Sequence, residues 1–284
     1  MIPAAFEYHR PTSVADAIKI IVEHGDEARV LAGGHSLIPL MKLRMTDLSH
    51  VVDLQSIADL KDISVSVDKI TIGAMVTQHE LITNADLQTA APIMMEAALQ
   101  IADPQVRYVG TLGGNVANGD PANDMPGLMQ CLNATFHLSG PNGARTVAAR
   151  EFYEAAYFTA REEEEILTAV SFSPTSGGYA YEKHKRKIGD YATAAAAVLI
   201  SKDGASCSGA SIALTNLADT PIYCEAAVAA LVGSTLDEAA IGAAVAAAVG
   251  AAAPGEDLRG PVEFKKHAAG VVIRRAIERA IERA

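Results

Sequence analysis

The chain has 284 residues, of which 50% are hydrophobic and 5% aromatic, and its formal net charge is −11. This composition is globular rather than disordered, and the acidic balance excludes the overall basic surface that nucleic-acid-binding proteins carry. The N-terminus has no apolar segment of the signal-peptide kind, and no stretch approaches the roughly 20 bulky apolar residues of a membrane span. We therefore expect a soluble, cytoplasmic protein with one large core or two to three small lobes.

The cysteines Cys131, Cys207 and Cys224 are odd in number and far apart. Neither a CxxC pair nor a Cys/His spacing typical of zinc or iron–sulfur ligands is present. We expect buried free thiols in a reducing compartment, and no metal centre within this chain.

The first 54 residues carry the pattern of a small α/β unit. Residues 12–25 begin with a capping hydroxyl, end on glycine and have one apolar helical face. Residues 28–34 predict a short buried strand that ends in glycines, and Ser36 is a candidate cap for a helix over 37–45. A second buried strand is expected at 50–54, which completes a strand–turn–helix–strand order.

Residues 63–77 alternate in polarity on both sides of a polar Asp-Lys pair, which predicts a β-hairpin. The following segment, 78–102, is helical in character. We expect a break near Asn84 and a restart at Pro92, because proline is favoured in the first turn of a helix.

Residues 109–126 are rich in Gly, Asn and Asp and predict a loop, after which 124–134 are expected to be helical. A hairpin is expected over 135–149, and a charged segment that becomes a strand over 162–172. Residues 173–178, Ser-Pro-Thr-Ser-Gly-Gly, are the best candidate for a linker.

Beyond this linker the pattern changes to strands followed by helices, which favours a separate α+β domain. The expected strands cover 179–187, 192–201 and 207–218, and the expected helices cover 223–233, 235–249 and 263–284. The second of these helices is rich in alanine, and we expect it to pack closely against a neighbour.

Two glycine pairs carry candidate binding chemistry: Gly33-Gly34-His35-Ser36 after a strand, and Thr111-Leu112-Gly113-Gly114-Asn115 in a loop. Glycine lets backbone N–H groups approach an anion closely, and a helix N-terminus adds a positive dipole. Two such elements facing each other could hold a pyrophosphate from both sides. Taken alone, the first motif is better explained as an ordinary helix start and the second as an ordinary loop. Neither has the GxGxxG or the P-loop spacing.

Other catalytic templates fit poorly. His35 and Ser36 are adjacent, so their side chains diverge, and no GxSxG, HExxH or EF-hand pattern occurs. Asp120 and Asp124 could form a paired-carboxylate site, but turn and cap chemistry explains them equally well.

Three segments together give a specific signature: residues 32–45, 109–129 and 179–198. With them the chain resembles the FAD-binding medium subunits of the molybdenum hydroxylases, the xanthine dehydrogenase family, and is most similar to the aerobic carbon monoxide dehydrogenase branch. The resemblance extends from Pro3 to the terminal helix. His35 agrees with that branch.

The resemblance implies an α+β fold with a two-part FAD-binding α/β region. An N-terminal FAD-binding subdomain is expected at 1–53 and a middle FAD-binding subdomain at 54–176. A C-terminal α+β domain, with a three-stranded antiparallel sheet and helices, is expected at 177–284.

The resemblance also implies the residues that hold FAD, and it implies neither a catalytic residue nor a metal ligand. The pyrophosphate would be bound by Ala32, Gly33, Gly34, His35 and Ser36, opposed by Thr111, Gly113, Gly114 and Asn115. Asn118 and Asp124 match positions on the adenosine or ribityl side, and Leu167 matches a backbone contact to FAD. Lys183 matches a lysine near the flavin; a match shifted by two residues would assign this role to Lys185 instead. Tyr191 would lie over the flavin ring.

The function implied is that of an electron-transfer subunit, a flavoprotein oxidoreductase component that is active only within a complex. A large subunit with the molybdenum cofactor and a small [2Fe-2S] subunit are the expected partners, in a dimer of heterotrimers. The external acceptor would be a quinone. The complex would lie in the cytoplasm, either free or held at the inner face of the cell membrane.

Three alternatives remain open at this stage. The chain could serve a related molybdenum hydroxylase that acts on an aldehyde or an N-heterocycle, or it could be a non-redox nucleotide-binding subunit. A stand-alone flavoenzyme that uses NAD(P)H would need a second nucleotide site, and the Rossmann fingerprint is missing.

Overall fold

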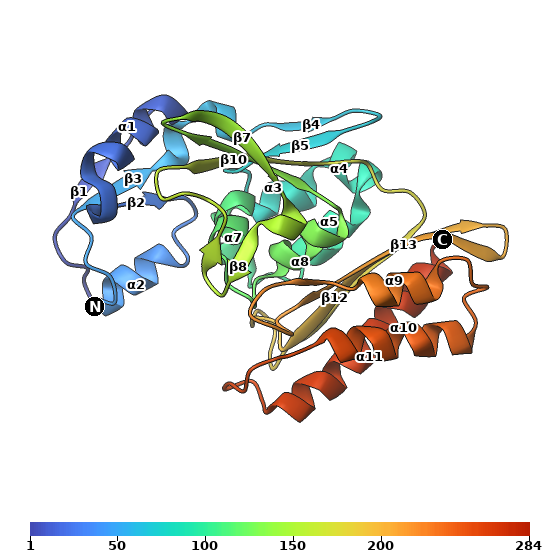
Figure 1. Ribbon diagram of the computed structural model, residues 1–284. Helices are drawn as coiled ribbons and strands as arrows, with labels where there is room; N and C mark the ends of the chain where they lie inside the picture. Colours follow the sequence, from blue (N-terminus) through green and yellow to red (C-terminus); the bar gives the residue numbers. More distant parts are fainter.

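The computed structural model describes residues 1–284, and its three main sheets follow one another along the chain (Figure 1). The first sheet is parallel, in the order β1 (Glu7–His9), β3 (His50–Asp53), β2 (Ala28–Leu31). Helix α1 (Val14–His24) packs on it. The predicted small α/β unit is confirmed, and β1 is an addition, since its largely exposed residues gave no alternating pattern.

The ends of α1 follow from the local sequence. The Ser13 hydroxyl accepts the N–H of Asp16, so Ser13 is the N-cap. Gly25 ends the helix with φ +50°, a conformation that is costly for residues with a Cβ. A short helix α2 (Leu37–Leu43) follows β2.

The middle of the chain forms an antiparallel sheet backed by short helices. Its strand order is β4 (Ile63–Val65), β5 (Ile70–Gly73), β10 (Ile166–Phe172), β6 (Thr135–Gly140), β7 (Gly143–Ala148). The helices are α3 (Gln78–Thr83), α4 (Ala85–Ala90), α5 (Pro92–Ala98), α6 (Pro104–Arg107), α7 (Leu112–Ala117) and α8 (Asp124–Cys131), and a small ribbon is formed by β8 (Tyr153–Ala155) and β9 (Phe158–Thr159). Both predicted hairpins are confirmed, as are the break at Asn84, which caps α4, and the restart at Pro92.

The third sheet is antiparallel, in the order β11 (Gly178–His184), β12 (Ala194–Asp203), β13 (Ser206–Thr215), β14 (Ile222–Tyr223). The three predicted strands are confirmed, and β14 adds a fourth of two residues. The predicted helices are present as α9 (Glu225–Leu231), α10 (Glu238–Ala251) and α11 (Val262–Glu282). The alanine-rich α10 packs against α9 and α11, as expected.

Both faces of the third sheet are buried, which explains the nearly continuous apolar run of β12. Successive side chains of a strand point to opposite faces. Ala194, Ala196 and Val198 belong to the core shared with α9–α11, whereas Ala195 and Ala197 belong to the core of the middle unit. The small side chains allow helices to pack closely on both sides.

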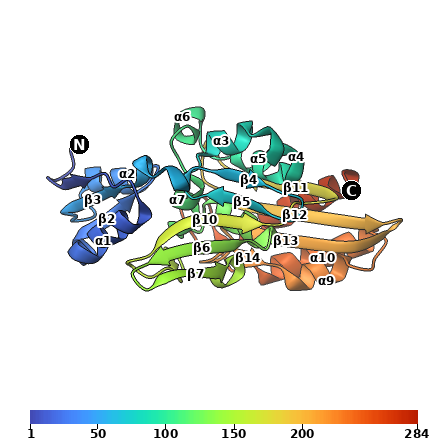
Figure 2. The same cartoon turned by 90° about the horizontal axis from the view of Figure 1, so that it is seen from above.

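The molecule therefore has layers: the middle sheet, its helices, the third sheet, and finally α9–α11 (Figures 1 and 2). Glu96 on α5 links the middle helices to the C-terminal part. It accepts the backbone N–H of Tyr181 at 2.7 Å and pairs with Arg279 and Arg283 at 3.3 and 2.8 Å. The domain boundaries after residues 53 and 176 remain predictions.

All three cysteines are buried and free, as expected. None of the helices is both long enough and apolar enough to cross a membrane.

Candidate functional site

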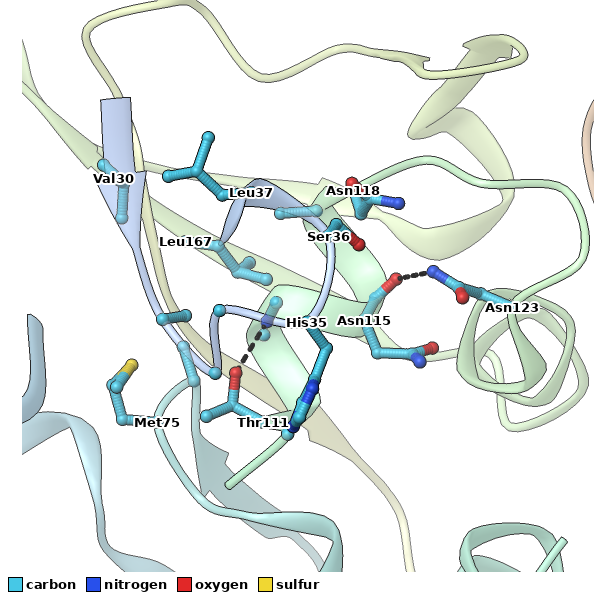
Figure 3. Close-up of a pocket in the computed structure, with 18 of the residues that line it drawn as sticks. Val30, His35, Ser36, Leu37, Met75, Thr111, Asn115, Asn118, Asn123 and Leu167 are labelled. Atoms are coloured by element: carbon cyan, nitrogen blue, oxygen red, sulfur yellow. Dashed lines mark hydrogen bonds between the residues drawn. The ribbon is translucent and has the colours of Figure 1, made fainter. Parts of the chain in front are cut away.

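A cavity of about 600 Å³ lies between the first sheet, the middle unit and the loop after β11. This volume is within the usual range of cofactor sites, about 300–1,000 Å³. Figure 3 shows residues from strand ends, helix starts and loops that face this space. The fourteen residues expected to bind FAD all lie in its wall: Ala32, Gly33, Gly34, His35, Ser36, Thr111, Gly113, Gly114, Asn115, Asn118, Asp124, Leu167, Lys183 and Tyr191.

The first glycine motif connects the end of β2 to α2. Gly34 has φ +76°, which glycine adopts without strain. The backbone N–H groups of residues 32–36 have no acceptor within the protein. Five consecutive free donors beside a cavity form a ready anion site, because an anion can accept several of them at once.

The prediction that Ser36 caps α2 with its side chain is wrong. Ser36 stands at the N-cap position, but its φ of −102° and ψ of −53° are helical, and its hydroxyl accepts no N–H of the helix. An N-cap side chain needs extended backbone to reach back over the first turn. The Ser36 hydroxyl therefore remains available to a ligand in the cavity.

The second glycine motif is a helix and not the predicted loop. Thr111 is the N-cap of α7, and its hydroxyl accepts the N–H of Gly114 at 3.0 Å. The N–H groups of Leu112 and Gly113 donate to the carbonyls of Val76 and Ala74, and that of Asn115 donates to Thr111. This motif therefore cannot grip an anion with glycine N–H groups, as the first can. Only the N–H and hydroxyl proton of Thr111 and the side-chain amide of Asn115 remain to face a ligand.

The two motifs touch at Gly33. A Cβ on Gly33 would lie 2.7 Å from both the Cα of Gly110 and the carbonyl oxygen of Val109. Gly113 is equally confined, since a Cβ there would lie 2.5 Å from the Cβ of Ala74. The glycines thus serve two purposes. Both glycines of the first motif have free backbone donors, and Gly33 and Gly113 in addition allow close contact between backbone segments.

Two hydrogen bonds from the segment around the start of α8 hold Asn115 of α7 in place. The side-chain oxygen of Asn115 accepts the N–H of Met125 at 3.2 Å, and its carbonyl accepts the side chain of Asn123 at 3.0 Å (Figure 3). The Asn115 amide nitrogen is thereby oriented and left without a protein partner. Asn118 lies one helical turn farther and also faces the cavity.

Asp124 is buried and forms an ion pair with Lys183 at 2.8 Å, with side chains 5% and 1% exposed. Its other oxygen accepts the phenol of Tyr181 at 2.6 Å. Burial, and then the Asp124 charge, hold the pKa of Tyr181 well above its usual value, so Tyr181 stays a neutral donor. A carboxylate oxygen has a second lone pair, so Asp124 can still accept a bond from a ligand hydroxyl.

Asp120 closes a turn by accepting the N–H of Ala122 at 2.9 Å. Because Asp120 holds a turn and Asp124 is bonded to Tyr181 and Lys183, the paired-carboxylate alternative has no support.

Lys183, and not Lys185, lies in the cavity wall. The Lys185 ammonium donates to the side chain of Gln100 at 2.6 Å, and burial and the neighbouring Lys183 charge lower its pKa. Tyr191 is 43% exposed at the cavity rim, with the Arg259 guanidinium 5.5 Å from its ring centre. Burial, and then the Asp120 charge, raise the pKa of Tyr191.

Residues 4–175 match the family described as the FAD binding domain in molybdopterin dehydrogenase. Residues 179–280 match the CO dehydrogenase flavoprotein C-terminal domain. The chain belongs to the FAD-binding subunits of the molybdopterin dehydrogenases. Its 56% identity to the carbon monoxide dehydrogenase medium chain of Afipia carboxidovorans covers 100% of this chain and 99% of that one.

Solved structures agree with this assignment. The crystal structure of cyanide-inactivated Cu,Mo-CO dehydrogenase contains a chain with a TM-score of 0.98 and 56% identity over 100% of both chains. Quinoline 2-oxidoreductase from Pseudomonas putida 86 gives a TM-score of 0.95 at 32% identity over 99% of both chains. The expected α+β fold and the family resemblance are both confirmed.

The cofactor of this FAD-binding subunit is FAD, and the cavity fits its chemistry. The row of free N–H groups at 32–36 suits the diphosphate. The amide of Gln78, in the same wall, is buried, and both its nitrogen and its oxygen lack a partner in the protein. The individual contacts of the fourteen residues to FAD remain predictions.

The sequence interpretation missed other residues of the cavity wall, among them Gln78, Arg29 and Arg161. Arg161 donates to the carbonyls of Glu162, Glu163 and Glu165, and burial lowers its pKa, with a smaller effect from the Arg29 charge. The two guanidinium groups lie in the same wall as the carboxylates of Glu163 and Glu165, so this part of the wall carries charges of both signs. No local motif marks these residues, because only the packing of the first sheet against the middle unit brings them together.

FAD held by these wall residues would supply one- and two-electron redox chemistry. The role of the chain in its family is electron transfer within an oxidoreductase complex. The protein residues bind and orient the cofactor, and none of them has to form a covalent bond.

Proposed function

We propose that this chain is the FAD subunit of an aerobic carbon monoxide dehydrogenase. Electrons from the oxidation of carbon monoxide at a molybdenum-containing large subunit pass through [2Fe-2S] clusters of a small subunit to FAD on this chain, and then to a quinone. The observation that carries the proposal is the 56% identity to a carbon monoxide dehydrogenase medium chain over the whole length.

The wall residues have distinct parts in this proposal. The N–H groups of residues 32–36 and the Ser36 hydroxyl hold the diphosphate, opposed by the side chains of Thr111 and Asn115. Asp124 and Asn118 bind hydroxyls of the cofactor, and Leu167 contributes a backbone contact. Lys183 lies near the flavin ring, and Tyr191 covers it at the cavity rim and restricts access of solvent.

The assembly is part of the proposal. One copy each of the large, small and FAD subunits forms a heterotrimer, and two heterotrimers associate. The complex works in the cytoplasm, either free or held at the inner membrane face through its other subunits.

The substrate is tested by co-expressing the chain with its two partner subunits and purifying the complex under anaerobic conditions. We expect one FAD per chain, and we expect carbon monoxide to bleach the flavin absorbance, with recovery on addition of a quinone. If an aldehyde or an N-heterocycle bleaches the flavin and carbon monoxide does not, the chain serves a related hydroxylase. The fold shared with quinoline 2-oxidoreductase makes this second outcome the relevant competitor. A purified complex without flavin would favour the non-redox nucleotide-binding alternative.

A further inference from the structure

Three histidines meet on one side of the first sheet, outside the cavity wall. His9 ends β1, His24 is the last residue of α1, and His50 begins β3. These elements lie side by side at the N-terminal end of the molecule (Figure 1). One ring nitrogen of each histidine lies within 4.8 Å of those of the others, and all three residues are half-buried.

The contacts within this cluster are close. The His9 Nε2 and His50 Nδ1 atoms are 2.9 Å apart. The His24 and His50 rings are stacked, with centroids 3.6 Å apart and planes 9° from parallel. The Glu7 carboxylate lies 3.6 Å from His50 Nδ1, because Glu7 and His50 are partners in the parallel strand register.

We propose that His9, His24 and His50 bind one divalent zinc ion, with Glu7 as the fourth ligand. Three imidazoles and one carboxylate are a ligand set that zinc accepts in tetrahedral geometry. Zinc–nitrogen bonds of about 2.0–2.1 Å place the ligand nitrogens roughly 3.3–3.4 Å apart. The three histidine nitrogens lie within 4.8 Å of one another, with one pair at 2.9 Å, and these separations bracket this value. To bind the ion, the stacked His24 and His50 rings must rotate out of parallel so that their nitrogens converge, and the Glu7 carboxylate, which lies near His50, must turn toward the other two rings.

The surroundings favour a cation. His24 lies in the last turn of α1, where the free carbonyls of a helix carry partial negative charge. Glu7 adds a full negative charge on the adjacent strand. Since the three histidines come from three different elements, the ion would fasten the short strand β1 to α1 and β3. The site is thus structural, and it is separate from the electron-transfer role of the chain.

The competing interpretation is a hydrogen-bonded and stacked imidazole cluster that holds no ion. It is tested on the full chain, purified with its FAD and stripped of metal by a chelator. Zinc is then titrated in competition with a chromophoric chelator. We expect one zinc per chain, and an increase of the melting temperature on zinc addition. A native chain that binds no zinc, or that binds it without any change in melting temperature, would overturn the proposal.

Variants locate the ion. Loss of an outer-shell partner weakens metal affinity about 10- to 100-fold, so loss of a direct ligand in His9→Asn, His24→Asn or His50→Asn should weaken zinc binding by about 100-fold or more. His267, which is exposed on α11, supplies the control His267→Asn, and we expect native affinity for it. Equal zinc affinity in the control and in all three cluster variants refutes the site.

A measurement on the native chain avoids the question of whether variants fold. X-ray absorption at the zinc edge of the loaded protein should show the multiple scattering of three imidazole rings with one further oxygen ligand. A spectrum without imidazole scattering rejects the assignment.

Discussion

The side chain of Gln78 is only 1% exposed in the cavity wall, and its amide nitrogen and oxygen both lack a protein partner. Leaving such a group unpaired in the folded protein costs about 1–3 kcal/mol. A ligand that supplies both a donor and an acceptor recovers that cost, provided that the wall side chains that cover the Gln78 amide shift when the ligand binds. We infer that Gln78 contacts FAD, although it belongs to no glycine motif.

Replacement of Gln78 by leucine separates this role from a structural one. The change removes an unpaired polar group, so we expect the free energy of unfolding of the FAD-free chain to stay the same or to rise. FAD affinity should fall roughly 5- to 160-fold, since each of two lost hydrogen bonds contributes about 0.5–1.5 kcal/mol. Fluorescence titration with FAD and urea unfolding measure the two effects.

Gln130 provides the control, because it is also buried, its amide oxygen is also unpaired, and it lies outside the cavity wall. Gln130→Leu should leave FAD affinity unchanged. If Gln78→Leu keeps native FAD affinity, Gln78 is no cofactor contact.

Among the elements, the two glycine motifs look alike in sequence but differ in the structure. The first leaves its N–H groups free, whereas the second uses those of Leu112, Gly113 and Gly114 within the protein. The sequence predicted a loop at Thr111–Asn115, because each glycine in a helix costs about 1 kcal/mol relative to alanine. Bonds from the start of α7 to the carbonyls of Val76 and Ala74 outweigh this preference. Only the tertiary structure supplies these acceptors.

Local patterns predicted the elements that depend on local interactions. Both hairpins, the capped break at Asn84 and the amphipathic terminal helix are examples. Strand β1 was missed because it is held by pairing with the distant β3 rather than by an alternating pattern of its own. For the site, the family resemblance supplied positions that prove to share one cavity, but not the free or occupied state of their N–H groups.

The contact between the motifs is tested by Gly33→Ala. The new Cβ would lie 2.7 Å from two backbone atoms, which cannot move aside as a flexible side chain could. We expect the motifs to separate, with a loss of about 1–3 kcal/mol in the free energy of unfolding and little FAD retained on gel filtration.

Gly242→Ala in α10 is the matched control, because nothing lies within 4 Å of its Cβ position. Alanine there should stabilise the helix by up to about 1 kcal/mol and leave FAD bound. Native flavin content in Gly33→Ala would contradict a role for the close approach.

At the scale of the whole molecule, the cavity is built by all three parts of the chain. The first sheet contributes the free N–H groups, the middle unit contributes α7 and Asp124, and β11 contributes Lys183. The buried ion pair between Asp124 and Lys183 is thus both part of the wall and a link between the middle unit and the C-terminal sheet. A change there should affect stability and cofactor binding together.

The variants Lys183→Met and Lys185→Met test this link with matched chemistry. Lys183→Met leaves the buried Asp124 without its counter-ion, which typically costs about 3–5 kcal/mol. We expect that loss in urea unfolding, and weaker FAD retention because the adjoining wall loosens. Lys185 donates to the neutral side chain of Gln100 and lies outside the wall, so its replacement should cost less than about 1.5 kcal/mol and leave FAD bound. Equal effects of the two variants would contradict the assignment of Lys183 to the wall, and a larger effect of Lys185→Met would reverse it.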